Sequence, residues 1–192
     1  MSTTPTVGTE QLPKSGTWHV DTAHTSANFS ARHLGMSKVR GRFDTLDGTL
    51  TIGDDPTESH VEVTIDASSI STNQPDRDAH LKSADFLDIE NHPELTFRST
   101  RVYGDGEDWK MDGELTIRGT TRPVTLDVEF LGVMDNPLGP GRRAAFEATT
   151  SITRHDFGLT WEGPQELGGI LVGSKVSIDI DAQFITDTGD VQ

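Results

Sequence analysis

The sequence predicts an all-β protein, built as an antiparallel barrel or sandwich, and three observations support this fold class. Apolar and polar residues alternate with a period of two in several segments, as in strands whose successive side chains face opposite sides of a sheet. Turn-forming clusters such as 53–56, 104–106 and 136–141 separate these segments. The continuous apolar runs and long helical crossovers of a parallel sheet are absent.

The predicted strands follow one another along most of the chain. The clearest is 109–117, where Trp109 and Met111 share one face and Lys110 and Asp112 share the other. One face of this strand is therefore expected to be buried and the other to be exposed to solvent. The same alternation predicts further strands at 27–31, 46–52, 61–66, 124–130, 146–152 and 176–184.

One segment departs from the strand pattern and predicts a short helix near residues 75–83. Pro75 suits the first helical turn, and Lys82 lies near the end, where a positive charge complements the helix dipole. Phe86 and Leu87 follow the helix and need an apolar surface to cover. We expect this segment to lie across the open end of a barrel.

The length of 192 residues predicts a single domain with a tail at each end. Residues 1–16 predict a disordered N-terminal tail, residues 17–186 the barrel domain, and residues 187–192 a short C-terminal tail. The first residues lack the apolar stretch of a signal peptide, and no apolar run reaches the roughly 20 residues that span a bilayer. We therefore expect a cytoplasmic protein without a transmembrane segment.

Charge and composition exclude several classes of function. The chain has 16 Lys and Arg against 31 Asp and Glu, and the resulting net charge of −15 argues against a nucleic-acid partner. The absence of cysteine excludes thiol nucleophiles and thiolate metal sites. The seven histidines lack the spacing of metal-binding motifs, and no catalytic or phosphate-binding motif occurs. We predict no catalytic residue, no metal site and no cofactor.

Small residues at predicted inward positions bear on whether a barrel would be hollow. Ala27, Ala31, Gly113, Ala148 and Ala182 alternate with large apolar residues. In a sandwich such residues would complete a dense, dry core, whereas in a barrel of about eight strands they leave room on the axis for one slender ligand. These inward positions carry almost no charge, so a cavity of this kind selects a hydrocarbon chain. The alternation alone leaves both interpretations open.

Longer motifs add what periodicity cannot provide. In order along the chain they are WHVD at 18–21, SIST at 69–72, RDAHLKSADFLD at 77–88, PELTFRST at 93–100, GELTIRGTTRPV at 113–124 and RHDFG at 154–158. With these motifs the chain resembles the YceI-like family, lipocalin-like bacterial proteins described as binding polyisoprenoids. The resemblance implies an extended eight-stranded antiparallel β-barrel, a lipid chain threaded into its apolar pore, and a homodimer.

The function predicted on this basis is the non-catalytic binding, transport or storage of an isoprenoid or similar long-chain lipid. Two alternatives remain: a small-molecule enzyme that uses the same cavity, and a stress-related protein-interaction module with a dense barrel. Strand phase and motif position predict the ligand-binding residues, with the three arginines as candidates for a polar head group. They are Phe29, Phe43, Phe86, Leu87, Phe97, Met111, Phe157, Trp161, Arg32, Arg98 and Arg154.

Overall fold

A computed structural model describes residues 12–164 and 171–186, and these residues form one antiparallel sheet with one short α-helix. Residues 1–11 of the expected tail at 1–16, and the expected tail at 187–192, lie outside the described residues. The strands are β1 Gly16–Val20, β2 Ser26–His33, β3 Ser37–Phe43, β4 Leu46–Ile52, β5 His60–Asp66, β6 Ile70–Ser71, β7 Glu94–Asp105, β8 Asp108–Ile117, β9 Thr120–Asp135, β10 Arg142–Thr153 and β11 Val172–Ile185. The helix is α1 Pro75–Lys82, and the 3₁₀ turns are η1 Pro56–Glu58, η2 Ala67–Ser69 and η3 Arg154–Phe157.

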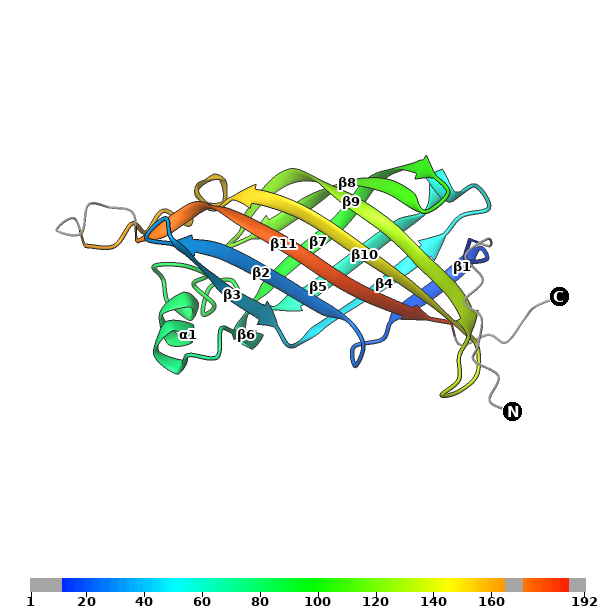
Figure 1. Ribbon diagram of the computed structural model, residues 1–192, viewed down its shortest axis with the longest axis horizontal. Coiled ribbons are helices and arrows are strands. Elements are labelled where there is room, and N and C mark those ends of the chain that lie inside the picture. The colour runs from blue at the N-terminus through cyan, green and yellow to red at the C-terminus, as the bar shows by residue number, and fades with distance from the viewer. Residues whose placement is uncertain (1–11, 165–170, 187–192) are drawn as a thin grey trace.

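Eight of these strands close into a barrel. Their order around the ring is β1-β4-β5-β7-β8-β9-β10-β11, and β11 pairs back with β1. Every pairing is antiparallel, and most neighbours in the chain are also neighbours in the ring. Figure 1 shows the strands running obliquely along an elongated barrel, with α1 at one end and the described chain ends at the other. The predicted eight-stranded antiparallel barrel is confirmed.

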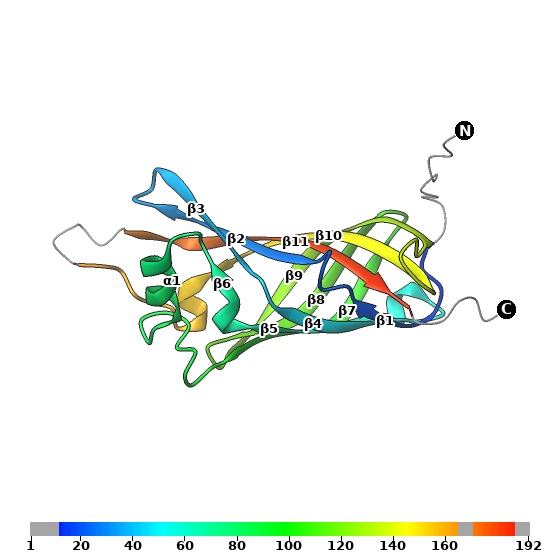
Figure 2. The same ribbon diagram turned by 90° about the horizontal axis from the view of Figure 1, so that it is seen from below.

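The remaining strands extend the sheet at the α1 end of the barrel. The strand β2 pairs with the same edge of β11 as β1 does, but farther toward the start of β11. The strand β3 forms a hairpin with β2, and β6 pairs with β3. The pairing of β6 with β3 covers only Arg42↔Ser71 and Phe43↔Ile70. Residues 37–41 therefore form an open edge in the part of the chain that the structure describes. In Figure 2 the tip of the β2–β3 hairpin diverges from the barrel on this side.

The predicted helix is present as α1, and its polar side chains fasten it to the end of β6. The Gln74 side chain caps the helix by accepting a hydrogen bond from the Arg77 amide (2.7 Å). The Asp78 carboxylate accepts a bond from the Thr72 amide (2.8 Å), and Arg77 donates to the Thr72 carbonyl (3.1 Å). Because Thr72 is buried, these bonds fix the helix against the barrel rim. Leu81, Phe86 and Leu87, at the end of the helix and after it, line the barrel interior.

The seam between β1 and β11 is short, and an ion pair reinforces it. The seam has two Cα partner pairs, His19↔Ile185 and Val20↔Phe184. Directly beyond it, Arg143 on β10 donates hydrogen bonds to the Asp21 carboxylate and to the Gln183 amide oxygen. The side chains of Arg143 and Asp21 are 11% and 13% exposed, so solvent screens this pair only weakly. Closure of the ring at this point therefore depends on side chains as well as on the backbone.

This seam gives a pH-dependent prediction. Burial acts to raise the pKa of Asp21, but hydrogen bonds from Arg143, His24 and the Ala23 amide outweigh it and hold the pKa of this carboxyl below its ordinary value. A lowered carboxylate pKa adds stability above the unfolded-state pKa, and that stability is lost as pH falls through the lower folded-state value. Asp21→Asn should therefore reduce the free energy of unfolding by about 2 kcal/mol at pH 7. Urea titrations from pH 7 down to pH 2.5 should show the difference shrinking below about pH 4, and a pH-independent difference would contradict the assignment.

Candidate ligand-binding site

The barrel encloses a cavity of about 590 Å³ along its axis. This volume lies within the range of roughly 300–1,000 Å³ that is usual for small-molecule sites. Its walls come from inward-facing positions of the strands, closed at one end by residues that follow α1. Apolar side chains provide most of the lining, as the alternation of the strands requires. The dense, dry core that the sequence left open as an alternative is therefore wrong.

Small side chains create part of this space, although not at every expected position. Ala27, Ala31, Ala148 and Ala182 all line the cavity. Gly113 was also expected to widen the pore, but the ring of Phe97 lies so close to it that an added Cβ atom would collide with the ring. Gly113 therefore makes room for an aromatic side chain, which occupies the space that the missing Cβ leaves open.

Several predicted ligand residues meet around this cavity. Phe29 and Phe43 lie on neighbouring strands with their ring centroids 5.7 Å apart, and Phe97 and Met111 face inward from β7 and β8. The geometry thus brings together side chains from both halves of the sequence. The predicted residues that line the cavity are Phe29, Phe43, Phe86, Leu87, Phe97, Met111 and Arg154.

Two predicted arginines lie outside the cavity because of strand alternation. Phe97 faces inward, so its neighbour Arg98 faces outward, where it is 72% exposed and pairs with Glu62 (3.1 Å). Ala31 likewise faces inward, and Arg32 is exposed on the outer surface of β2. These two candidates for a head-group contact therefore lie outside the cavity lining, and the strand phase of their neighbours indicates this.

Two predicted aromatic residues also fail to line the cavity, for a different reason. The chain leaves β10 as the 3₁₀ turn η3, so the alternation of a strand no longer fixes which side chains point inward. Phe157 is 2% exposed and packs in an apolar cluster with residues such as Ile117 and Leu95. Trp161 packs against Phe86, with ring centroids 5.3 Å apart, and thus supports a lining residue without lining the cavity itself.

Arg154 is the cationic group most deeply buried beside the cavity, and its donors are already engaged. It is 3% exposed and donates to the backbone carbonyls of Leu159 (2.6 Å), Val172 (3.0 Å) and Gly173 (3.1 Å). Burial lowers the pKa of Arg154, while the nearby carboxylate of Glu162 (3.4 Å) acts in the opposite direction. Arg154 therefore ties the chain after η3 to the start of β11.

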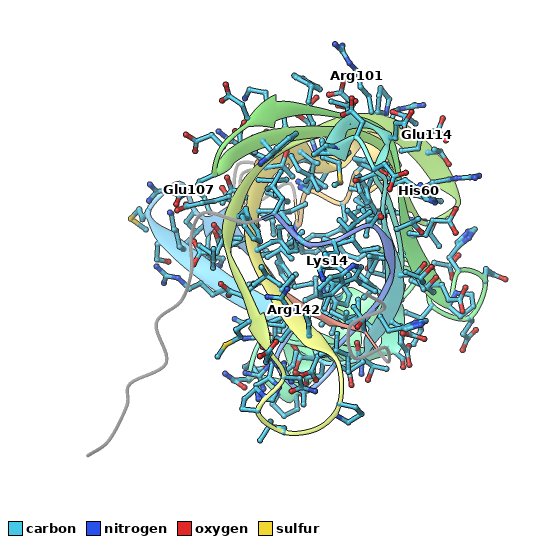
Figure 3. All side chains as sticks on the ribbon, turned by 90° about the vertical axis from the view of Figure 1, so that its right-hand side faces the viewer. Lys14, His60, Arg101, Glu107, Glu114 and Arg142 are labelled. Atoms are coloured by element: carbon cyan, nitrogen blue, oxygen red, sulfur yellow. The ribbon has the colours of Figure 1, made fainter. Side chains whose placement is uncertain are left out.

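The opposite end of the cavity is lined by residues that the sequence assigned to a disordered tail. Residues 12–15 contribute to the lining, Pro13 is buried, and the Trp18 indole donates to the Lys14 carbonyl (3.2 Å). Figure 3 looks along the barrel from this end and shows Lys14 inside the ring of strands, with Arg101 and Glu114 outside it. The boundary predicted at residue 16 is thus too late, and Leu12-Pro13 just before Trp18 was the available signal.

The cavity lining carries few ionisable side chains. Its ionisable side chains among the described residues are Lys14, Asp54, Lys110 and Arg154, which include neither a histidine nor a pair of carboxylates. Within the same described part of the chain, no group of three or more His, Asp or Glu residues is placed to hold a metal ion. The one α-helix found there is too short to cross a bilayer.

Comparisons with solved structures find the same architecture. BcnA of Burkholderia cenocepacia superposes with a TM-score of 0.72 at 20% identity, covering 85% of this chain and 98% of that chain. A YCEI protein of Campylobacter jejuni gives a TM-score of 0.69 at 26% identity, covering 82% and 90%. A polyisoprenoid binding domain from Saccharophagus degradans, implicated in plant cell wall breakdown, gives 0.65 at 18% identity, covering 88% and 98%. At these identities the first and third likenesses show a shared fold.

Comparisons with related sequences identify the protein family of this chain. A UPF0312 protein of Enterobacter sp. strain 638 is 44% identical over 143 residues, which is 73% of this chain and 74% of the relative. Protein YceI of Escherichia coli is 44% identical over 137 residues, 71% of either chain. The model of the YceI-like domain matches residues 18–184, nearly all of the barrel. This chain, an eight-stranded barrel around an apolar cavity, therefore belongs to the YceI-like family.

Proposed function

We propose that this barrel binds an isoprenoid or similar long-chain lipid in its axial cavity and holds it without chemical change. The observation that carries the proposal is the apolar cavity of about 590 Å³. Burial of a hydrocarbon is worth about 0.8 kcal/mol per CH₂, so a chain of ~20 carbons gains about 16 kcal/mol before the costs of binding. After the losses of ligand freedom on association, micromolar to nanomolar affinity remains.

The distribution of polar groups supports a ligand whose tail lies inside and whose head lies at an end. A phosphate or carboxylate buried at mid-barrel would lose its hydration without finding free donors there. Arg154, the cation most deeply buried beside the cavity, already donates to three backbone carbonyls. Lys14 and Asp54 lie in the part of the lining near the chain start and η1. The family membership and the fold shared with a polyisoprenoid binding domain further support a lipid ligand.

The two alternative functions are less consistent with the site. An enzyme in this cavity would need an acid, base or metal group poised beside the ligand, and the lining supplies neither histidine nor paired carboxylates among the described residues. A protein-interaction module with a dense barrel does not need an internal cavity. The roles of carrier or store, the homodimer and the cytoplasmic location stay predictions.

Native mass spectrometry of freshly purified protein tests the proposal. We expect an excess mass of one long-chain lipid per barrel, which organic extraction should release intact and unmodified. Protein stripped of this lipid should take up a fluorescent fatty probe at micromolar concentration or below. Absence of bound lipid together with failure to take up the probe would refute the proposal. Conversion of the bound molecule during incubation would favour the enzyme instead.

A further inference from the structure

The β2–β3 hairpin carries a positive charge that is unusual for this protein. Residues 22–43 contain Arg32, Lys38, Arg40 and Arg42 and no Asp or Glu, in a chain whose net charge is −15. We call residues 26–43 the basic hairpin. Figure 2 shows that its tip diverges from the barrel at the α1 end.

The register of the hairpin places these cations on one face. Arg32 lies directly opposite Lys38, and Ser30 lies opposite Arg40, which puts all three cations on the outer surface of the sheet. All three are exposed, and none of them forms an ion pair with another described residue, whereas Arg42 pairs with Asp44 (2.6 Å). Like charges placed directly opposite each other destabilise a hairpin. The fold therefore concentrates positive charge here at a cost in stability.

Two large apolar side chains are exposed at the tip of the same hairpin. Leu34 is 42% exposed and Met36 is 71% exposed. Leu34 also adopts a left-handed backbone conformation (φ 52°), which is unfavourable for a large side chain. Hydrogen bonds from the Leu34 amide to the Leu171 carbonyl (3.2 Å) and from the Met36 amide to the His33 carbonyl (3.0 Å) hold this turn. The turn thus presents apolar groups to solvent beside the basic face.

The basic hairpin also lies beside one end of the cavity. Ala31 on β2 and Val172 on β11 both line the cavity, and Val172 pairs with His33, the residue before Leu34. The apolar lining therefore extends to within three residues of the exposed tip. A lipid chain that entered the barrel beside the hairpin tip would therefore meet the apolar cavity wall within a few residues of the tip.

Protection of an open sheet edge explains only part of this arrangement. Lysine and arginine on edge strands discourage pairing with other chains, and Lys38 and Arg40 lie on the open edge of β3. Arg32 lies on β2, which pairs with β11 on one side and with β3 on the other. Because β2 is not an edge strand, protection of an open edge does not explain Arg32. Exposed Leu34 and Met36 would favour association with other molecules instead of preventing it.

We propose that the basic hairpin docks on the surface of an anionic lipid bilayer, with Leu34 and Met36 inserted among the head groups. Basic residues beside exposed apolar ones are the combination that binds such surfaces. The overall negative charge does not prevent this, because charges are screened over about 8 Å at physiological ionic strength. Residues 26–43 themselves contain no acidic residue, so the charge that the hairpin presents to a bilayer is positive. This inference does not depend on what the cavity binds.

Co-sedimentation of the full chain with lipid vesicles tests the proposal. We expect binding to vesicles that mix phosphatidylcholine with phosphatidylglycerol, weak binding to phosphatidylcholine alone, and loss of binding in high salt. Replacing Arg32, Lys38 and Arg40 together with glutamine should weaken binding to the anionic vesicles about 100-fold. The double variant Leu34→Ser and Met36→Ser should weaken it about tenfold or more, while thermal unfolding stays close to wild type.

Matched controls lie elsewhere on the surface. Leu138 is 75% exposed in the β9–β10 loop at the opposite end of the barrel, and Arg122 is exposed on β9. Leu138→Ser and Arg122→Gln should leave vesicle binding unchanged. The proposal is overturned if the wild-type protein does not bind anionic vesicles, or if the control substitutions weaken binding as much as the hairpin substitutions do.

Self-association is distinguished by its own measurement. Light scattering after size-exclusion chromatography reports the oligomeric state of every variant. If the Leu34→Ser and Met36→Ser variant dissociates an oligomer while vesicle binding persists, the tip contacts a second copy of the chain and the proposal is wrong. Uptake of a dissolved fluorescent fatty probe should be unchanged in the hairpin variants, so failure of docking and failure of lipid binding give different results.

Discussion

Replacing Ala148 with phenylalanine should strongly weaken lipid loading while leaving the barrel folded. Ala148 lines the cavity from β10, between Val128 on β9 and Ile180 on β11. A benzyl group at this point would project into the axial space and block the path of a slender chain. We expect affinity for a fluorescent fatty probe to fall tenfold or more, corresponding to a loss of about 1.4 kcal/mol or greater. Titration of stripped protein with the probe measures the effect.

The next residue along β10 provides the control for this variant. Thr149 is exposed on the outer surface, so Thr149→Phe adds the same ring outside the barrel and should leave uptake unchanged. Overpacking of a dense core costs roughly 1–3 kcal/mol, but in a hollow barrel the new ring occupies empty space and the cost should be smaller. Full uptake by Ala148→Phe would show that the axial cavity is not where the lipid binds.

Replacing Arg154 with alanine should destabilise the protein by about 3–5 kcal/mol, the largest loss of stability expected for a single substitution here. The guanidinium is 3% exposed and satisfies the carbonyls of Leu159, Val172 and Gly173. Its removal leaves these carbonyls without their donor and opens a space beside the cavity. Tm should fall by roughly 10 °C or more, measured by circular dichroism.

Two further variants identify the cause of that loss. Arg154→Lys keeps the charge but cannot reach three carbonyls with a planar fork, so it should recover only part of the stability. Arg122→Ala removes an arginine that is exposed on β9 and should change Tm by no more than about 2 °C. An Arg154→Ala protein as stable as the wild type would show that the network after η3 does not hold the end of the barrel.

Much of the fold could be predicted because strand alternation is a local property. The segment 109–117 falls within β8, and its apolar positions Trp109, Met111 and Leu115 all line the cavity. The helix at 75–83 was visible because proline and charge signals act within a few residues. The pairing of β1 with β4 and of β11 with both β1 and β2 could not be predicted, because long-range register leaves no local pattern.

The sequence predicted the cavity-lining residues correctly where the chain forms a regular strand, and incorrectly where the strand ends in a turn. Phe29 and Phe97 face the cavity as the alternation requires, and the same alternation turns Arg98 outward. Phe157 and Trp161 lie in and after η3, where a turn replaces the strand and the side-chain directions follow its geometry. Residues 12–15 were assigned to a tail because the first sixteen residues are rich in Thr, Pro, Gly and Ser, yet they line the cavity beside Trp18.

The sequence by itself predicted strands at 27–31, 46–52, 61–66, 109–117, 124–130, 146–152 and 176–184 and the apolar character of one side of each, because alternation depends on residues two apart. The strands β1, β3, β6 and β7 were not predicted from this alternation. Only the tertiary structure decided that the inward faces surround an open cavity, since the remaining space depends on how side chains from eight strands fill the axis together. It likewise decided that Arg32, Lys38 and Arg40 share one outward face beside an exposed apolar tip. Closure and register bring distant residues together, and no short stretch of sequence contains that information.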